Sequence, residues 1–270
     1  MSRTGLQHHA VRPQWLATRV EEAIDPAQPI IDAHHHLFHR AGGERYLFED
    51  FLADLDCGHR VIATVHVQGR GMHRADGPQE MRPVGETEFI NGVAAMSASG
   101  IYGPTQVCAG IVAFADLRQG ARVAEVLQAH VVGGGGGAAE GGRLRGIRQS
   151  GASDADPALT NPAYSTTEDM MASPRFREGF AQLERFGLSY DTWLLFPQIP
   201  RLTALAQAFP GTAIVLDHCG GVLGVGRYQD RHADVLREWR ASLAELVRMA
   251  GALGIVAGAI DAGRQVQAGL

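Results

Sequence analysis

Short aliphatic segments alternate with helix-like segments along most of this chain, and this alternation restricts its fold more than any other feature. Runs rich in Val, Ile and Leu occupy residues 29–34, 60–68, 107–116, 144–149, 190–195 and 213–218. Between them, apolar residues recur at helical spacing over 86–99, 120–132, 173–187, 199–209 and 231–252. Strands separated by such helices pair in parallel, and the helices cover the sheet. The pattern therefore predicts an α/β fold.

A TIM-type (β/α) barrel is the favoured architecture for such a chain. A closed barrel has eight strands, whereas six are predicted here, with residues 254–260 as a candidate seventh. The barrel is therefore expected to be incomplete at its C-terminal end. An open doubly wound sheet is the alternative, although its glycine-rich dinucleotide turn does not follow the first strand. We expect residues 1–28 to form a leader and residues 29–270 to form one barrel domain.

The composition excludes several classes of protein. The 270 residues carry 24 Lys and Arg against 29 Asp and Glu, a formal charge of −5, and 45% of the residues are hydrophobic. Neither a disordered chain nor a basic nucleic-acid module is expected from these values. Cys57, Cys108 and Cys219 are far apart, so a disulfide framework or thiolate zinc site is not predicted.

The same chain contains no segment with the hydrophobicity and length of a signal peptide or a membrane span. We therefore expect a cytoplasmic protein whose partner is a small-molecule substrate, with no nucleic acid and no membrane. Self-association into a homo-oligomer is a further expectation.

The densest group of chemically useful residues stands at the end of the first predicted strand, in Asp32-Ala-His34-His35-His36. Side chains alternate between the faces of a strand, so Asp32, His34 and His36 are expected on one face and His35 on the other. Barrel enzymes place their active sites at the carboxyl ends of their strands. Two imidazoles can aim at one point there, although a merely solvated strand end is the alternative.

A further histidine, His218, stands at the end of the sixth predicted strand, just before Cys219 and a glycine turn. His34, His36 and His218 are therefore expected to converge from two strands and to form the catalytic group. Strand alternation turns Asp217 away from His218, which predicts a supporting role for this carboxylate.

Other polar residues near strand ends are candidates for contacts with a substrate: His66, Gln68, Arg148, Trp193 and Gln198. On the second strand, His66 and Gln68 are expected to face the barrel lumen, opposite an aliphatic face that packs under helices. Arg148 could hold a carboxylate through a bidentate pair. A hydrogen-bonded interior role for His66 and a surface ion pair for Arg148 are the alternatives. The remaining histidines are expected at the surface: His8, His9, His39, His59, His73, His130 and His232.

With these motifs the chain resembles the amidohydrolase-related (amidohydrolase-2) family of TIM-barrel hydrolases, which includes sugar lactonases and muconolactone- or pyrone-type lactonases. The matching segments run in the family's order from about residue 29 to 247, and they are IIDAHHHLF, GETEF, LRGIRQS, YDTWLLFPQIPRL and AIVLDHCGG leading into REWRASLAELV. The resemblance implies hydrolysis of a lactone or similar carbonyl-carbon bond. It also implies that His34, His36 and His218 are ligands of a divalent metal, usually zinc, in members that use one.

Two departures from the family pattern bear on the chemistry. Phe196 stands where the family often has a histidine before the Pro-Gln of its fifth strand, which removes one potential ligand. The match also fades after about Val247, before the family's last strand and its aspartate, as expected of a frame shift or a premature end. Lactone hydrolysis needs an activated water, a group that polarises the carbonyl and an acid for the leaving alkoxide. Asp261 is a candidate for the missing carboxylate.

Three functional hypotheses stay open at this point. The first is a lactonase-like hydrolase that depends on His34 and His218. The second is a catalytically silent remnant that binds a ligand or associates through an uncovered sheet edge. The third is a decarboxylase that works at a histidine-bound metal. Loops after the strands set the choice of substrate, so the sequence does not name it.

Overall fold

The computed structural model describes residues 12–40, 45–161, 164, 166–250 and 255–257. In these ranges one sheet of seven strands has the order β1-β4-β5-β6-β7-β8-β9, and every neighbouring pair is parallel. Its strands are β1 (Pro29–His35), β4 (Arg60–Val67), β5 (Gln106–Ala113), β6 (Leu144–Arg148), β7 (Ser189–Thr192), β8 (Ile214–Leu216) and β9 (Ile255–Ala257). A separate antiparallel pair is formed by β2 (Phe38–His39) and β3 (Arg45–Tyr46).

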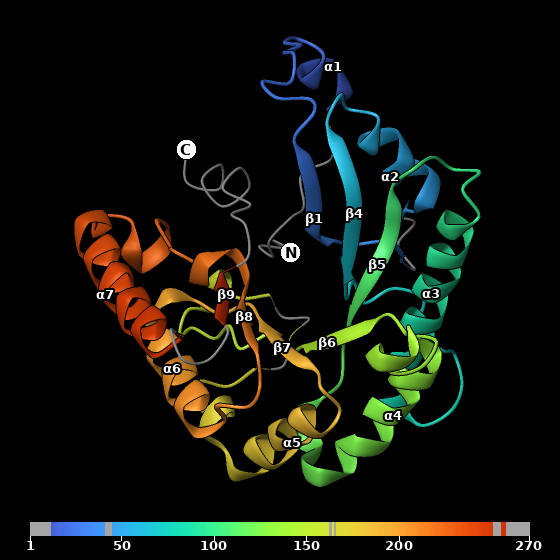
Figure 1. Ribbon diagram of the computed structural model, residues 1–270. Helices are drawn as coiled ribbons and strands as arrows, with labels where there is room; N and C mark the ends of the chain where they lie inside the picture. Colours follow the sequence, from blue (N-terminus) through green and yellow to red (C-terminus); the bar gives the residue numbers. More distant parts are fainter. Residues whose placement is uncertain (1–11, 41–44, 162–163, 165, 251–254, 258–270) are drawn as a thin grey trace, which may run out of the picture.

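Figure 1 shows that the sheet is curved and that helices α3 to α7 lie around its outside. The α-helices of the described part are α1 (Pro13–Leu16), α2 (Phe48–Leu55), α3 (Val84–Ala98), α4 (Val123–Gly133), α5 (Pro174–Arg185), α6 (Ile199–Ala208) and α7 (His232–Ala250). Short 3-10 helices span Gln79–Met81, Leu117–Arg122, Ala138–Glu140, Pro157–Leu159, Met170–Ala172, Phe196–Gln198, Asp217–Gly220 and Gly226–Tyr228. Within the described ranges, every helix is too short or too polar to span a lipid bilayer.

Within the described residues, this architecture confirms the prediction of a TIM-type α/β barrel with fewer than eight strands. Each of the six predicted strands and five predicted helices is present, and β9 lies within the candidate seventh strand at 254–260. The sheet ends at β1 on one side and at β9 on the other in the part of the chain that the structure describes. The short elements α1, α2, β2 and β3 were not predicted, because two to eight residues carry too little periodicity.

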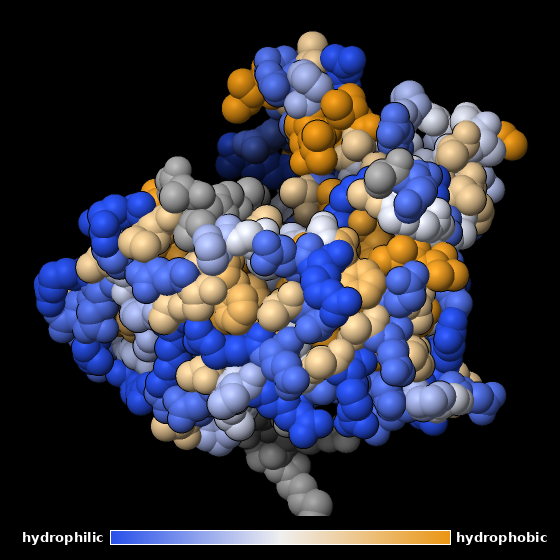
Figure 2. All heavy atoms as spheres, turned by 60° about the horizontal axis from the view of Figure 1, so that its bottom comes forward, coloured by the Kyte–Doolittle hydropathy of each residue, from blue (hydrophilic) through white to orange (hydrophobic). Residues whose placement is uncertain are grey.

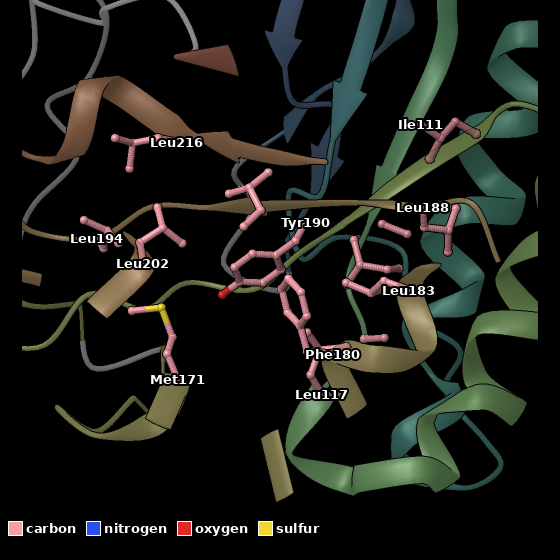
Figure 3. Packing of buried hydrophobic residues seen from close by; sticks show 14 of the residues in the cluster. Ile111, Leu117, Met171, Phe180, Leu183, Leu188, Tyr190, Leu194, Leu202 and Leu216 are labelled. Atoms are coloured by element: carbon pink, nitrogen blue, oxygen red, sulfur yellow. The ribbon is translucent and has the colours of Figure 1, made fainter. Parts of the chain in front are cut away.

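Helix α5 illustrates how local signals and packing agree in this chain. Ser173 caps the helix through its hydroxyl, which accepts a hydrogen bond from the Phe176 amide at 3.2 Å, and Gly187 follows its end with φ of +63°. Its apolar face meets β7 in the core, where the rings of Phe180 and Tyr190 lie 5.1 Å apart (Figure 3). Both side chains are fully buried. The core therefore lies between the sheet and its outer helices.

The surface is mostly polar but carries exposed hydrophobic residues at the N-terminal side. Hydrophilic residues cover much of the face drawn in Figure 2. Five large apolar side chains are exposed along α1, the segment after it and the edge strand β1, namely Trp15, Leu16, Val20, Ile24 and Ile31. An open edge of this kind favours association with another strand. Self-association nevertheless stays a prediction.

Candidate active site

Three histidines gather where the first and sixth strands of the barrel end. His34 is the residue before the last one of β1, His36 directly follows β1, and His218 follows β8. The ring centroid of His34 lies 5.0 Å from that of His36 and 5.0 Å from that of His218. Four strands separate β1 from β8 in the sheet order, so it is the curvature of the sheet that brings these side chains together. The predicted grouping of the three histidines is thus present.

The backbone after β8 does not follow the strand alternation that we assumed. His218 and Cys219 have φ values of +52° and +54°, in the left-handed region, so the regular strand ends at Leu216. As a result Asp217 points into the same cluster as His218. Its Oδ1 lies 3.8 Å from Nδ1 of His34. The prediction that Asp217 faces away from His218 was therefore wrong.

Arg148 and Asp217 form a buried ion pair beneath the histidines. The Nε–H of Arg148 donates to Oδ2 of Asp217 at 2.6 Å, and the two side chains are 8% and 1% exposed. The alternative of a surface ion pair for Arg148 is thereby wrong. Contact of Arg148 with a substrate stays a prediction, since its Nε–H is already used by the aspartate.

We expect Arg148→Met to lower the free energy of unfolding by about 3–5 kcal/mol, because Asp217 would stay buried without its cation. Urea unfolding monitored by circular dichroism measures this change. Arg74→Met is the matched control, because Arg74 pairs with Glu88 on the surface and an exposed pair contributes less than about 1 kcal/mol. Equal losses in the two variants would contradict a special role for the buried pair.

The imidazoles of His34 and His36 are held neutral by their surroundings. Burial, followed by the charge of Arg148, lowers the pKa of each to about 3. Nδ1 of His36 lies 2.7 Å from the Val67 carbonyl oxygen, and since a carbonyl only accepts, the ring proton is on Nδ1. Nε2 of His36 therefore keeps its lone pair. Nε2 of His34 is buried and has no hydrogen-bond partner in the described part of the chain.

His35 and His66 lie on the other side of the sheet, under the helices. The ring of His35 stacks on Phe51 of α2 with centroids 4.2 Å apart, as the alternation predicts. His66 is 1% exposed, and its Nε2 lies 3.4 Å from Oε1 of Glu86 on α3. The prediction that His66 faces the lumen was wrong, and the interior alternative holds. Periodicity separates the two faces of β4 but does not reveal that a helix supplies a carboxylate to one of them.

The other predicted substrate contacts differ in whether their polar side-chain atoms have hydrogen-bond partners within the protein. Gln68 is 1% exposed, and neither atom of its amide has a hydrogen-bond partner within the described ranges. The same holds for Nε1 of Trp193. The amide of Gln198, in contrast, accepts from the amides of Ser153 and Leu195. It also donates to the Gly151 carbonyl and the Ser153 hydroxyl. Contact of Gln68 and Trp193 with a substrate stays a prediction, whereas the side-chain amide of Gln198 is hydrogen-bonded within the fold.

Sequence reasoning missed three buried ionisable residues. Asp191 of β7 accepts a hydrogen bond from the Ser189 hydroxyl at 2.8 Å, and burial, followed by the charge of Asp217, raises its pKa to about 7. Glu86 is 4% exposed. His130 was predicted at the surface but is fully buried, with Nε2 3.0 Å from the Phe114 carbonyl oxygen. An acidic residue inside a strand, as in Ser-Tyr-Asp-Thr, was the one available signal.

A cavity of about 490 Å³ lies at the same edge of the sheet and is lined by residues that follow β5 and β6, including Asp116, Gln149 and Ser150. The histidines of the cluster are not among the residues that line it. No group of three or more His, Cys, Asp or Glu side chains surrounds a single metal position among the described residues. His8, His9 and Asp261 lie outside these residues.

The model of the Amidohydrolase family matches residues 31–253. An uncharacterized protein of Sinorhizobium fredii, y4mH, is 34% identical over 175 residues, which make up 65% of this chain and 50% of that protein. The chain therefore spans about half the length of the curated relative that it matches.

Solved structures show the same fold. An amidohydrolase from Burkholderia multivorans with bound zinc has a TM-score of 0.55 and 23% identity, and the match covers 84% of this chain and 68% of that one. A second crystal form from the same organism, with bound HEPES, has a TM-score of 0.54 at the same identity and coverage. At this level of identity the likeness concerns the fold alone.

Proposed function

This chain belongs to the amidohydrolase family, and from that premise we propose that it is a hydrolase that opens a lactone or similar cyclic ester or amide by attack of water on the carbonyl carbon. The observation that carries the proposal is the gathering of His34, His36 and His218 over the buried Arg148–Asp217 pair. The site lies at the carboxyl ends of parallel strands, where barrel enzymes act. The substrate is proposed to be a small molecule met in the cytoplasm.

When no metal is bound, His34 is the residue that we propose takes the proton of the attacking water; with a metal on its Nε2, that nitrogen would be a ligand instead. Its Nε2 is buried and without a hydrogen-bond partner among the described residues, and its low pKa keeps that nitrogen unprotonated at neutral pH. Asp217, 3.8 Å from Nδ1, is the carboxylate that we propose offsets part of the cost of the imidazolium that forms. The Arg148 guanidinium places positive charge beside the ring, and such charge stabilises an oxyanion at a nearby carbonyl.

A divalent metal, with zinc as the first choice, is the cofactor that we propose for His34, His36 and His218. Zinc binds the unprotonated nitrogens of neutral imidazoles. Nε2 of His36 and the buried Nε2 of His34 are nitrogens of this kind. The solved amidohydrolase from Burkholderia multivorans holds zinc. A bound metal of this kind supplies an acidified water and a polarised carbonyl. The charge of Arg148 beside the same rings opposes cation binding, so we expect weak affinity.

The experiment that tests the proposal is proton release from a panel of sugar lactones, muconolactones and pyrone lactones, run with zinc and with a chelator. We expect turnover above the uncatalysed rate for at least one lactone. Release of carbon dioxide without ring opening would instead support a decarboxylase. If the folded protein shows neither reaction under any of these conditions, the proposed hydrolysis is contradicted.

A further inference from the structure

Glu86 carries a buried carboxylate that the proposed reaction does not use. It lies in the first turn of α3 and is 4% exposed. Its Oε1 accepts from the Gly69 amide at 2.6 Å and lies 3.4 Å from Nε2 of His66, while its Oε2 lies 3.6 Å from Nε2 of His73. Burial of a carboxylate is costly unless such partners compensate it. The carboxylate therefore constrains both β4 and the loop that follows it.

The charge state of Glu86 follows from the same contacts. Burial alone would raise the pKa of this carboxyl group, but the bonds with His66 and His73 outweigh burial and lower the pKa to about 2. Glu86 is therefore ionised at neutral pH and acts only as an acceptor toward its neighbours.

An ionised Glu86 also selects the tautomer of His66. The Leu37 amide donates to Nδ1 of His66 at 3.3 Å, so that nitrogen carries no proton. The proton of a neutral His66 is then on Nε2, which faces Glu86. Leu37 directly follows His36 in the chain, so the tautomer of His66 holds the backbone next to a residue of the histidine cluster.

Gly69 lies next to both the Glu86 carboxylate and His36. A Cβ at Gly69 would lie 3.4 Å from Oε1 of Glu86, from Cβ of His36 and from the Leu37 carbonyl oxygen. The Val67 carbonyl that holds the His36 ring precedes Gly69 by two residues. The segment that carries the Val67 carbonyl is thus linked to Glu86 by the hydrogen bond of the Gly69 amide. The segment after His36 is linked to Glu86 through His66.

We infer that Glu86 is a positioning residue for His36, which it acts on through His66 and Gly69. The inference deepens the proposed function, since an oriented His36 Nε2 is what that function needs. Removal of the Glu86 carboxylate is expected to disturb the site while the sheet and the core stay folded, because the apolar contacts of α3 are unchanged.

The test compares Glu86→Leu with Glu86→Gln and with Glu88→Leu. Leucine leaves the Gly69 amide and His66 without an acceptor, so kcat on the panel's best lactone is expected to fall about 10- to 100-fold. Glutamine keeps an acceptor oxygen and is expected to restore most of the rate. Glu88 lies on the same helix but pairs with Arg74 at the surface, so its variant should match the wild type.

Nitrogen-15 NMR of the imidazoles measures which ring nitrogens carry protons, so it tests the inference without any measurement of turnover. We expect the wild type to carry protons on Nε2 of His66 and on Nδ1 of His36, and Glu86→Leu to shift both signals. A wild-type His66 protonated on Nδ1 would overturn the inference, even if Glu86→Leu fails to fold. Unchanged His36 signals and kcat in a folded Glu86→Leu would overturn it too. A wild type that opens no lactone would count against the proposed function alone.

Discussion

Turnover of the best lactone is expected to fall about 10²- to 10⁴-fold in His34→Ala, the range that the loss of a general base costs. The ring of His34 is central in the cluster, 5.0 Å from both His36 and His218. It is also the histidine next to Asp217, which lies 3.8 Å from its Nδ1. Alanine removes the proton acceptor and the link between the other two imidazoles. Steady-state kcat, measured by proton release, quantifies the loss.

His218→Ala is the companion variant, and His59→Ala is the matched control. His218 contributes the third ring of the cluster, so its loss should also lower kcat steeply. His59 is exposed, and its replacement should leave kcat unchanged. If both His34→Ala and His218→Ala keep wild-type turnover, the histidine cluster has no part in catalysis.

Acidification is the second change for which we expect a large effect, because several histidines are buried in their neutral form. Burial lowers the pKa of His34 and His36 to about 3 and that of His130 to about 4, and it places the pKa of His35 well below 6.5. In the unfolded chain each would titrate near 6.5. Between these values the unfolded state binds more protons, so acid favours unfolding.

The expected stability is therefore full above about pH 6.5 and declines as the pH falls toward the folded-state values. The free energy of unfolding should decrease by about 1.4 kcal/mol per pH unit for each buried histidine. Asp191 acts in the opposite direction, since its raised pKa of about 7 makes its folded state bind the extra proton. Four buried histidines outweigh this single aspartate, so the free energy of unfolding still decreases as the pH falls.

Urea unfolding at pH 7.5, 6.5, 5.5 and 5.0 measures this dependence. His130→Gln provides the matched variant, because His130 is buried beside Thr87 and Phe114, outside the histidine cluster. Removing it should make the decline shallower by about 1.4 kcal/mol per pH unit. A free energy of unfolding that stays constant from pH 7.5 to 5.0 would show that the histidines are not buried as neutral rings.

Much of the fold was predictable from the chain alone because its signals are local. Alternation of aliphatic and amphipathic segments identified the parallel α/β sheet, and helical spacing over 173–187 identified α5. Parallel strands share one carboxyl edge, so the positions of His34, His36 and His218 also indicated where the site lies. These conclusions need only the spacing of residues that are near one another in sequence.

Tertiary structure decided which way the side chains point and what they meet. The left-handed backbone at His218 broke the strand alternation, so that His218 and Asp217 share one cluster, and α3 supplied Glu86 to His66 from 20 residues away. Arg148 and Asp217 are 69 residues apart, yet they form the ion pair under the site. The periodicity of a strand shows which residues share a face, but it carries no information on the side chains that other segments place against that face. The chemistry of the site depends on those partners, since burial and neighbouring charge set whether each imidazole is neutral.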